Sequence, residues 1–129
     1  MKGAASDRDY LVACAAVSAA FAVGLGAYGA HGLAVEQSIL DIWKTGVAYQ
    51  MWHALGAIAA VWLASVRSGH MHTLCRVAGW ALLAGSLAFS IALYFFVIHA
   101  AVPVQGLAPA GGMVMIAGWL MIAFAALRR

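Results

Sequence analysis

The stretch VAGWALLAGSLAFSIALYFFVI, residues 77–98, decides how the chain folds. It carries no charged side chain, and its polar groups are limited to a few hydroxyls and one indole. A helix needs roughly 20 apolar residues to cross a hydrocarbon core of about 30 Å. The stretch is therefore expected to be a transmembrane helix.

Three further stretches of similar character lie at residues approximately 10–30, 46–66 and 111–127. Of the 129 residues, 66% are hydrophobic and 9% are charged, whereas a soluble domain is about half apolar and a quarter charged. Because lipid offers no partners to the backbone, a spanning segment must satisfy its own hydrogen bonds, which favours helices. The sequence predicts an all-α integral membrane four-helix bundle, a single transmembrane domain over residues 1–129.

The basic residues indicate the orientation of this bundle. The N-terminus, second loop and C-terminus hold Lys2, Arg8, Arg67, Arg76, Arg128 and Arg129, whereas the first and third loops together hold Lys44. Cytoplasmic loops retain Lys and Arg, so both termini are expected in the cytoplasm and the protein in the inner (plasma) membrane, with a mitochondrial inner membrane as the alternative. Scattered in this way, the basic residues do not predict a nucleic-acid partner.

The first loop, residues 33–44, has the pattern of a surface helix. Its apolar side holds Ile39, Leu40 and Trp43, and its polar side mostly holds Glu36, Gln37, Asp41 and Lys44. A two-sided pattern of this kind is typical of a helix that lies in the plane of the membrane surface. We expect a short interfacial helix between the first and second spans.

Small residues recur at helical spacing inside the spans. They are Ser18, Ala22, Gly26 and Gly29 in the first span, Gly46 and Gly56 in the second, and Gly79 and Ser86 in the third. Such stripes let helices approach closely in lipid, so a compact bundle is expected. The GxGxxG formed by Gly24, Gly26 and Gly29 is not read as a dinucleotide site, because it has no strand before it.

Polar side chains on the second and third spans form the candidate site. Tyr49, Gln50 and His53 lie on or beside one face of the second span, and Ser86, Ser90 and Tyr94 repeat every four residues along the third. These groups are costly in hydrocarbon unless they are hydrogen-bonded. A buried network between the two helices would satisfy both sets.

The histidines give the sharper alternative. His53 is expected about two turns in from the outer surface, and His31 ends the first span on the same side. Ionisable residues inside a membrane are functional candidates, so the pair could hold haem or a metal, or contact a quinone or lipid headgroup. The plainer interpretation is that both histidines cap or pack against neighbours. Our prediction includes no cofactor and no metal.

Several blocks of the sequence resemble a small membrane family of unknown function, numbered 423, whose eukaryotic relatives are called transmembrane protein 256. They are GAYGAHGL at 26–33, KTGVAYQMWHALG at 44–56, AGW at 78–80, FSIALY at 89–94, PAGG at 109–112 and AGWL at 117–120. The resemblance implies four spans and names no reaction. Ile91 and Ala92 stand where the family usually has glycine and serine, and Ala108 stands where it tends to have threonine.

No Ser-His-Asp, paired-carboxylate or phosphate-loop pattern occurs in the chain. The predicted function is therefore a non-enzymatic accessory or assembly component that packs in the bilayer against another membrane protein or a second copy. The alternative is a binder of a lipophilic ligand, a quinone, lipid or haem, on the outer-leaflet side. Its candidate residues are His31, Tyr49, Gln50, His53, Ser90 and Tyr94. A transporter is disfavoured, because no charged residue lies in the middle of a span.

Overall fold

A computed structural model describes residues 8–128 and contains four helices in that range. They are α1 (Tyr10–His31), α2 (Gln37–Ser65), α3 (Gly69–His99) and α4 (Leu107–Leu127). All four are long and apolar enough to cross a membrane, which confirms the four long apolar helices predicted from the sequence. The predicted topology signals at Lys2 and Arg129 lie outside the described residues.

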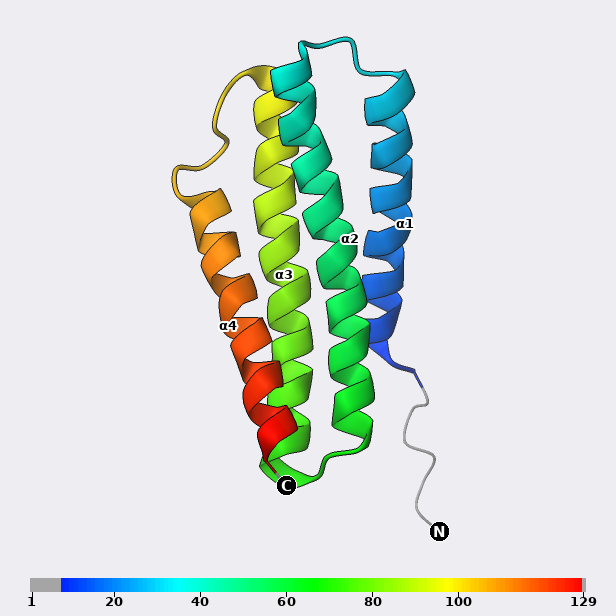
Figure 1. Ribbon diagram of the computed structural model, residues 1–129, viewed down its shortest axis with the longest axis vertical. Coiled ribbons are helices and arrows are strands. Elements are labelled where there is room, and N and C mark those ends of the chain that lie inside the picture. Colours follow the sequence, from blue (N-terminus) through cyan, green and yellow to red (C-terminus); the bar gives the residue numbers. More distant parts are fainter. Residues whose placement is uncertain (1–7, 129) are drawn as a thin grey trace.

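The helices stand side by side in an antiparallel row (Figure 1). α2 packs extensively on α3, α4 packs on α3, and α1 packs on α2. α1 meets α3 at only a few points, and α1 and α4 do not contact each other. The molecule is thus an open row of helices rather than a closed bundle, and α1 is held mainly by one neighbour.

α2 is longer than predicted, and the expected interfacial helix is absent as a separate element between α1 and α2. Residues 37–44 instead form the first turns of α2. The apolar side of this segment does not face the membrane surface: Trp43 is only 2% exposed and packs with Tyr94 and Val97 of α3. The segment does have one apolar and one polar side, but its apolar side packs against the neighbouring helices.

The third and fourth helices also begin earlier than predicted. α3 starts at Gly69, so most of the expected second loop is helical, and α4 starts at Leu107. Gly106 precedes α4 with a φ of 81°, a left-handed conformation that glycine adopts readily. Pro109 falls in the first turn of α4, where its missing N–H costs no helical hydrogen bond.

Small residues bring α3 and α4 into close contact. A Cβ added to Gly111 would lie 2.5 Å from the Gly85 carbonyl oxygen, and one added to Gly85 would lie 2.8 Å from the Gly111 oxygen. The backbones of the two helices therefore touch directly, as small residues allow in lipid, although the predicted stripes included neither of these glycines. Gly111 belongs to the PAGG block of the family resemblance.

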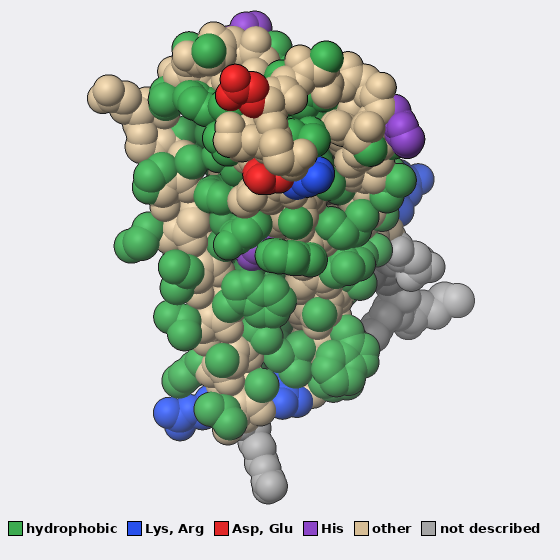
Figure 2. All heavy atoms as spheres, turned by 45° about the horizontal axis from the view of Figure 1, so that its top comes forward, with side chains coloured by type: hydrophobic (Ala, Val, Ile, Leu, Met, Phe, Trp, Pro, Cys, Tyr) green, Lys and Arg blue, Asp and Glu red, His purple; other side chains and the backbone are tan. Residues whose placement is uncertain are grey.

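Hydrophobic side chains cover the middle of the row, and arginines gather at one of its ends. Figure 2 shows hydrophobic side chains spread over the visible face between the ends. Arg8, Arg67, Arg76 and Arg128 all lie toward the end that holds the start of α1, the α2–α3 turn and the end of α4. Arg67 fixes that end, because its guanidinium donates to the carbonyl oxygens of Ala125 and Ala126 at 3.1 Å each, which would otherwise have no partner at a helix C-terminus.

Candidate functional site

Gln50 of α2 links three helices through its side-chain amide. Its Nε2 donates to the backbone oxygen of Ser18 on α1 at 2.9 Å, and its Oε1 accepts from the hydroxyl of Tyr94 on α3 at 2.8 Å. Gln50 is only 3% exposed. The predicted network between the second and third spans is confirmed at this pair, and it extends to α1.

A tight packing arrangement holds Tyr94 in place. The ring centroids of Tyr94 and Trp43 are 4.6 Å apart, and the Trp43 indole N–H donates to the Leu25 carbonyl oxygen of α1 at 2.8 Å. Gly46 provides the space for the ring, because an added Cβ there would lie 2.7 Å from Tyr94 Cε1. Ser90 reinforces this contact, since its hydroxyl donates to the Gly46 carbonyl oxygen at 2.7 Å.

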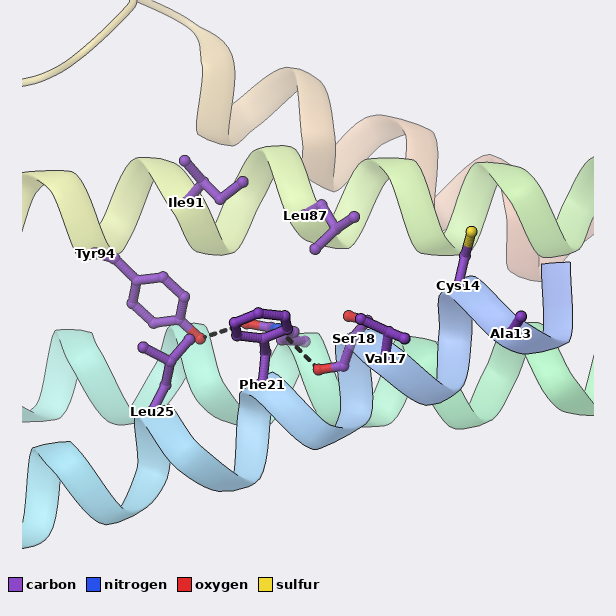
Figure 3. A pocket seen from close by; sticks show the side chains of 10 residues that line it. Ala13, Cys14, Val17, Ser18, Phe21, Leu25, Leu87, Ile91 and Tyr94 are labelled. Atoms are coloured by element: carbon purple, nitrogen blue, oxygen red, sulfur yellow. Dashed lines mark hydrogen bonds between the residues drawn. The ribbon is translucent and has the colours of Figure 1, made fainter. Parts of the chain in front are cut away.

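A groove of about 470 Å³ opens between α1 and α3, next to the hydrogen-bonded side chains of Gln50 and Tyr94 (Figure 3). Its α1 wall is formed by Ala13, Cys14, Val17, Ser18, Phe21 and Leu25, its α3 wall by Leu87, Ile91 and Tyr94, and Gln50 of α2 completes the lining. The walls are almost entirely apolar, and the polar groups are confined to Ser18, Gln50 and Tyr94. The groove exists because α1 and α3 barely touch, and α2 forms its floor.

Ser18 differs from the other polar groups of the lining. The residue is 5% exposed, and its side-chain oxygen is the one buried side-chain N or O atom among residues 8–128 that has no hydrogen-bond partner. A serine hydroxyl can both donate and accept, and leaving it unpaired in a buried place costs about 1–3 kcal/mol. A buried hydrogen-bonding group without a partner therefore lies in the lining of the groove, near Gln50.

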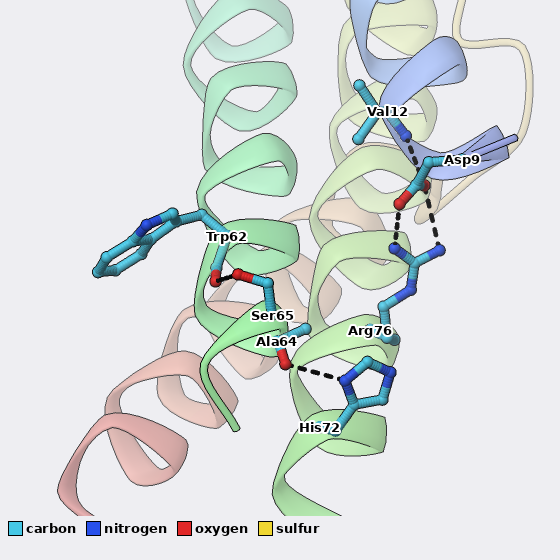
Figure 4. Close-up of polar contacts among 7 residues, drawn as sticks. All are labelled: Asp9, Val12, Trp62, Ala64, Ser65, His72 and Arg76. Carbon is cyan, nitrogen blue, oxygen red and sulfur yellow. Dashed lines mark hydrogen bonds and ion pairs between the residues drawn. The ribbon is translucent and has the colours of Figure 1, made fainter. Parts of the chain in front are cut away.

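An ion pair joins α1 to α3 at the basic end of the groove (Figure 4). Arg76 of α3 donates to both carboxylate oxygens of Asp9, at 2.6 and 3.1 Å. Asp9 also caps α1 by accepting from the Val12 backbone N–H at 3.1 Å. The hydrogen bonds from Arg76, more than any other contact, hold the pKa of Asp9 below its usual value. This pair is the polar link that fixes the start of α1 against α3.

The predicted histidine pair is not brought together. His31 is the exposed last residue of α1, whereas Ser18, which faces Gln50, lies 13 positions earlier, or roughly 20 Å along the helix. Because α2 begins at Gln37, His53 lies roughly 24 Å from the start of α2 rather than two turns from a surface. The prediction of depth took residue 46 as the start of the span, whereas the helix begins nine residues earlier.

His53 and Tyr49 lie away from the groove. His53 is 6% exposed, and its Nδ1–H donates to the Tyr49 carbonyl oxygen one turn earlier at 2.7 Å. The His53 ring meets Trp119 of α4 at a centroid distance of 6.0 Å, and the Tyr49 ring meets Phe89 of α3 at 4.7 Å. These contacts fit the packing interpretation of His53. Within residues 8–128, no three His, Cys, Asp or Glu side chains gather as metal ligands would.

Comparison with known proteins places the chain in a family. The model of the family described as "Protein of unknown function (DUF423)" matches residues 25–112. The chain belongs to this family. It is 40% identical over 115 residues to the UPF0382 membrane protein YwdK of Bacillus subtilis (strain 168), covering 88% of this chain and 92% of that protein.

Other members of the family are similar over nearly the same length. The UPF0382 membrane protein SAB0533 of Staphylococcus aureus (strain bovine RF122 / ET3-1) is 37% identical over 112 residues, covering 85% of this chain and 88% of that protein. The UPF0382 membrane protein SERP0230 of Staphylococcus epidermidis is 35% identical over 115 residues, covering 88% and 91%. No solved structure matches the chain significantly. The family resemblance seen in the sequence is confirmed, and the protein is a membrane protein.

The part of the chain that the family model matches contains most of the polar side chains around the groove. Gln50, Ser90 and Tyr94 lie within residues 25–112, whereas Ser18 and Cys14 lie before them. Ile91, which replaces a glycine of the family pattern, lies on the α3 wall of the groove. Sequence reasoning found Gln50 and Tyr94 but missed the groove and treated Ser18 only as a small packing residue. The available signal was a serine on a stripe of the first span that is otherwise alanine and glycine.

Proposed function

We propose that this member of the family is a non-enzymatic membrane component that binds a lipophilic molecule in the groove between α1 and α3. The observation that carries the proposal is the unpartnered hydroxyl of Ser18 beside the Gln50 amide, in an otherwise apolar groove. Ligand sites are typically concave and apolar, with a few convergent polar groups that fix orientation. The groove has this composition, and its volume falls in the range of small-molecule sites.

The basic end of the row is proposed to face the cytoplasm, because Lys and Arg are retained on that side. Ser18 lies eight positions after Tyr10, where α1 begins, or roughly 12 Å into the helix from that end. The proposed site therefore lies within the hydrocarbon core and nearer its cytoplasmic side. This position differs from the outer-leaflet site with His31 and His53 that the sequence analysis gave as the alternative function.

Native mass spectrometry of the protein in nanodiscs made from its host membrane tests the proposal. We expect a lipophilic molecule to remain bound after lipid is stripped, and Val17→Trp to displace it by filling the groove. The matched control is Val23→Trp, because Val23 is also exposed on α1 but does not line the groove. The proposal fails if no molecule is retained, or if both variants retain it equally.

The open row favours a second candidate, an assembly component that packs against another membrane protein or a second copy. α1 and α4 do not contact each other, so each edge of the row is free to meet another helix. Under this candidate the groove holds a helix of a neighbouring chain. Disulfide cross-linking through Cys14, which is exposed on the groove wall, distinguishes the two: a dimer at low protein-to-lipid ratio supports assembly and opposes a small ligand.

A further inference from the structure

We infer that the ligand of the groove is an isoprenoid quinone whose ring carbonyl accepts a hydrogen bond from Ser18. This inference rests on the proposed function and names the chemical class of the molecule. The hydrogen bonds that Ser18, Gln50 and Tyr94 make within the protein decide which of their atoms remain free to meet a ligand.

The free groups at the floor of the groove include two donors. The Ser18 hydroxyl has no partner. A glutamine amide has two hydrogens, and Gln50 uses one of them on the Ser18 carbonyl oxygen. The Tyr94 hydroxyl already donates its hydrogen to the side-chain oxygen of Gln50. A ligand atom that accepts hydrogen bonds, such as a carbonyl oxygen, therefore complements Ser18 and Gln50 together.

Charge excludes one class of carbonyl compound. None of the residues that line the groove is charged. An ionised carboxylate or phosphate without a cationic partner is very costly in a low-dielectric environment. Fatty acids and anionic lipid headgroups are therefore poor occupants, and a neutral carbonyl is favoured.

Depth excludes a second class. Ser18 lies roughly 12 Å from one end of α1 and roughly 20 Å from the other, inside the hydrocarbon core. The ester carbonyls of phospholipids lie in the interfacial regions outside that core. A neutral carbonyl at the depth of Ser18 belongs to a molecule whose polar ring is itself dissolved in hydrocarbon, as a quinone ring is. The groove opens to lipid between α1 and α3, so an isoprenoid tail can extend into the bilayer.

Labelling of Cys14 tests this inference directly. Cys14 is exposed and lines the groove, whereas Cys75 is buried, so N-ethylmaleimide should modify one site and Cys14→Ser should abolish the modification. In phosphatidylcholine nanodiscs, saturating decylubiquinone is expected to slow the labelling of Cys14 about tenfold. Decylbenzene, which has a similar chain and ring but no oxygen, is expected to protect far less.

Two serine variants identify the hydrogen bond. Ser18→Ala should raise the Kd for decylubiquinone about fivefold, which is the usual value of one neutral hydrogen bond. Ser86→Ala is the control, because the Ser86 hydroxyl bonds the Leu83 carbonyl oxygen of its own helix at 3.0 Å and does not line the groove. It should leave the Kd unchanged.

The outcomes separate this inference from the proposed function. Equal protection by decylubiquinone and decylbenzene, or a Kd that Ser18→Ala does not change, would overturn the inferred hydrogen bond to a quinone carbonyl. The proposal that the groove binds a lipophilic molecule would still stand. Failure of both probes to protect Cys14 overturns the quinone inference, while retention of a different molecule in native nanodiscs would still support the proposed function. Protection that follows the protein-to-lipid ratio instead of either probe assigns the groove to a second copy and overturns both.

Discussion

The Tyr94 hydroxyl on α3 donates a 2.8 Å hydrogen bond to the side-chain oxygen of Gln50 on α2, and the Gln50 amide passes the connection to α1 through the Ser18 carbonyl. α1 and α3 are thus connected through a residue of the helix between them, while their own surfaces meet at only a few points. The polar layer stabilises the row, and the space it leaves between α1 and α3 is the groove.

A double-mutant cycle at this pair should show direct coupling. Tyr94→Phe removes the hydroxyl and should lower the free energy of unfolding by about 1 kcal/mol. With Gln50→Met as the second change, we expect a coupling free energy of about 0.5–1.5 kcal/mol, the range found for hydrogen bonds between membrane helices. Unfolding in mixed micelles measures it. Strict additivity of the two changes would mean that the bond contributes nothing.

Gly46→Ala should destabilise the protein by about 1–3 kcal/mol, because the new Cβ would lie 2.7 Å from the Tyr94 ring. Gly24→Ala is the matched control in α1, since an added Cβ there meets nothing within 4 Å. Alanine is the better helix former, so that variant should be neutral or slightly more stable. The melting temperatures in detergent compare the two. Similar losses in both would show that the contact between Gly46 and Tyr94 is unimportant.

Ser18→Ala should stabilise the ligand-free protein by about 1 kcal/mol, because it removes a buried hydroxyl that has no partner. A functional group that costs stability is typical of binding sites. Thermal unfolding after exhaustive delipidation provides the measurement. A clear loss of stability would indicate that the hydroxyl has a structural partner and is not held for a ligand.

The Asp9–Arg76 ion pair should make stability depend on pH at the acid end. The pKa of Asp9 is lowered in the folded protein from its ordinary value of 3.8, so its contribution is complete above about pH 4 and is lost as the pH falls through the lowered value. The two side chains are about a third exposed, so the pair should contribute about 0.2–1 kcal/mol.

Asp9→Asn should flatten this acid decline while keeping an acceptor for the cap of α1. Asp41→Asn is the control, because Asp41 bonds the neutral Gln37 side chain. Chemical unfolding between pH 6 and pH 3 measures both variants. A decline in Asp9→Asn as steep as in the parent protein would assign the acid sensitivity to other groups.

Reporter fusions test the orientation. Fluorescent and phosphatase tags placed at residue 1 and at residue 129 should both report the cytoplasm, because Arg67 and Arg76 lie at the same end of the row as the start of α1 and the end of α4. A tag at Gly106, in the α3–α4 loop, should report the opposite side. Opposite reports from the two termini would contradict four spans.

The parts of this structure that follow from local patterns were predictable. Length and hydropathy predict the four spans, and the cost of polar groups in lipid predicts that Gln50 and Tyr94 find partners. The role of Trp43 was not predictable in this way, because a two-sided helix can bury its apolar side in a membrane surface or in its neighbours. That choice depends on tertiary packing.

The groove could not be predicted for a related reason. It depends on the distance between α1 and α3, which are not consecutive in the chain and scarcely touch. Whether the Ser18 hydroxyl bonds its own helix, as Ser86 does, or remains unpaired also depends on rotamer and packing rather than on residue type. The residue type of His31 and His53 suggested a shared ligand site, but their positions along α1 and α2 keep them apart.

A density map of the protein in native lipid would show directly what occupies the groove between α1 and α3. We expect a non-protein molecule between α1 and α3, with a polar atom within hydrogen-bond distance of the Ser18 hydroxyl. A groove filled by a helix of another chain, or a bound molecule beside His53 with the groove empty, would contradict it.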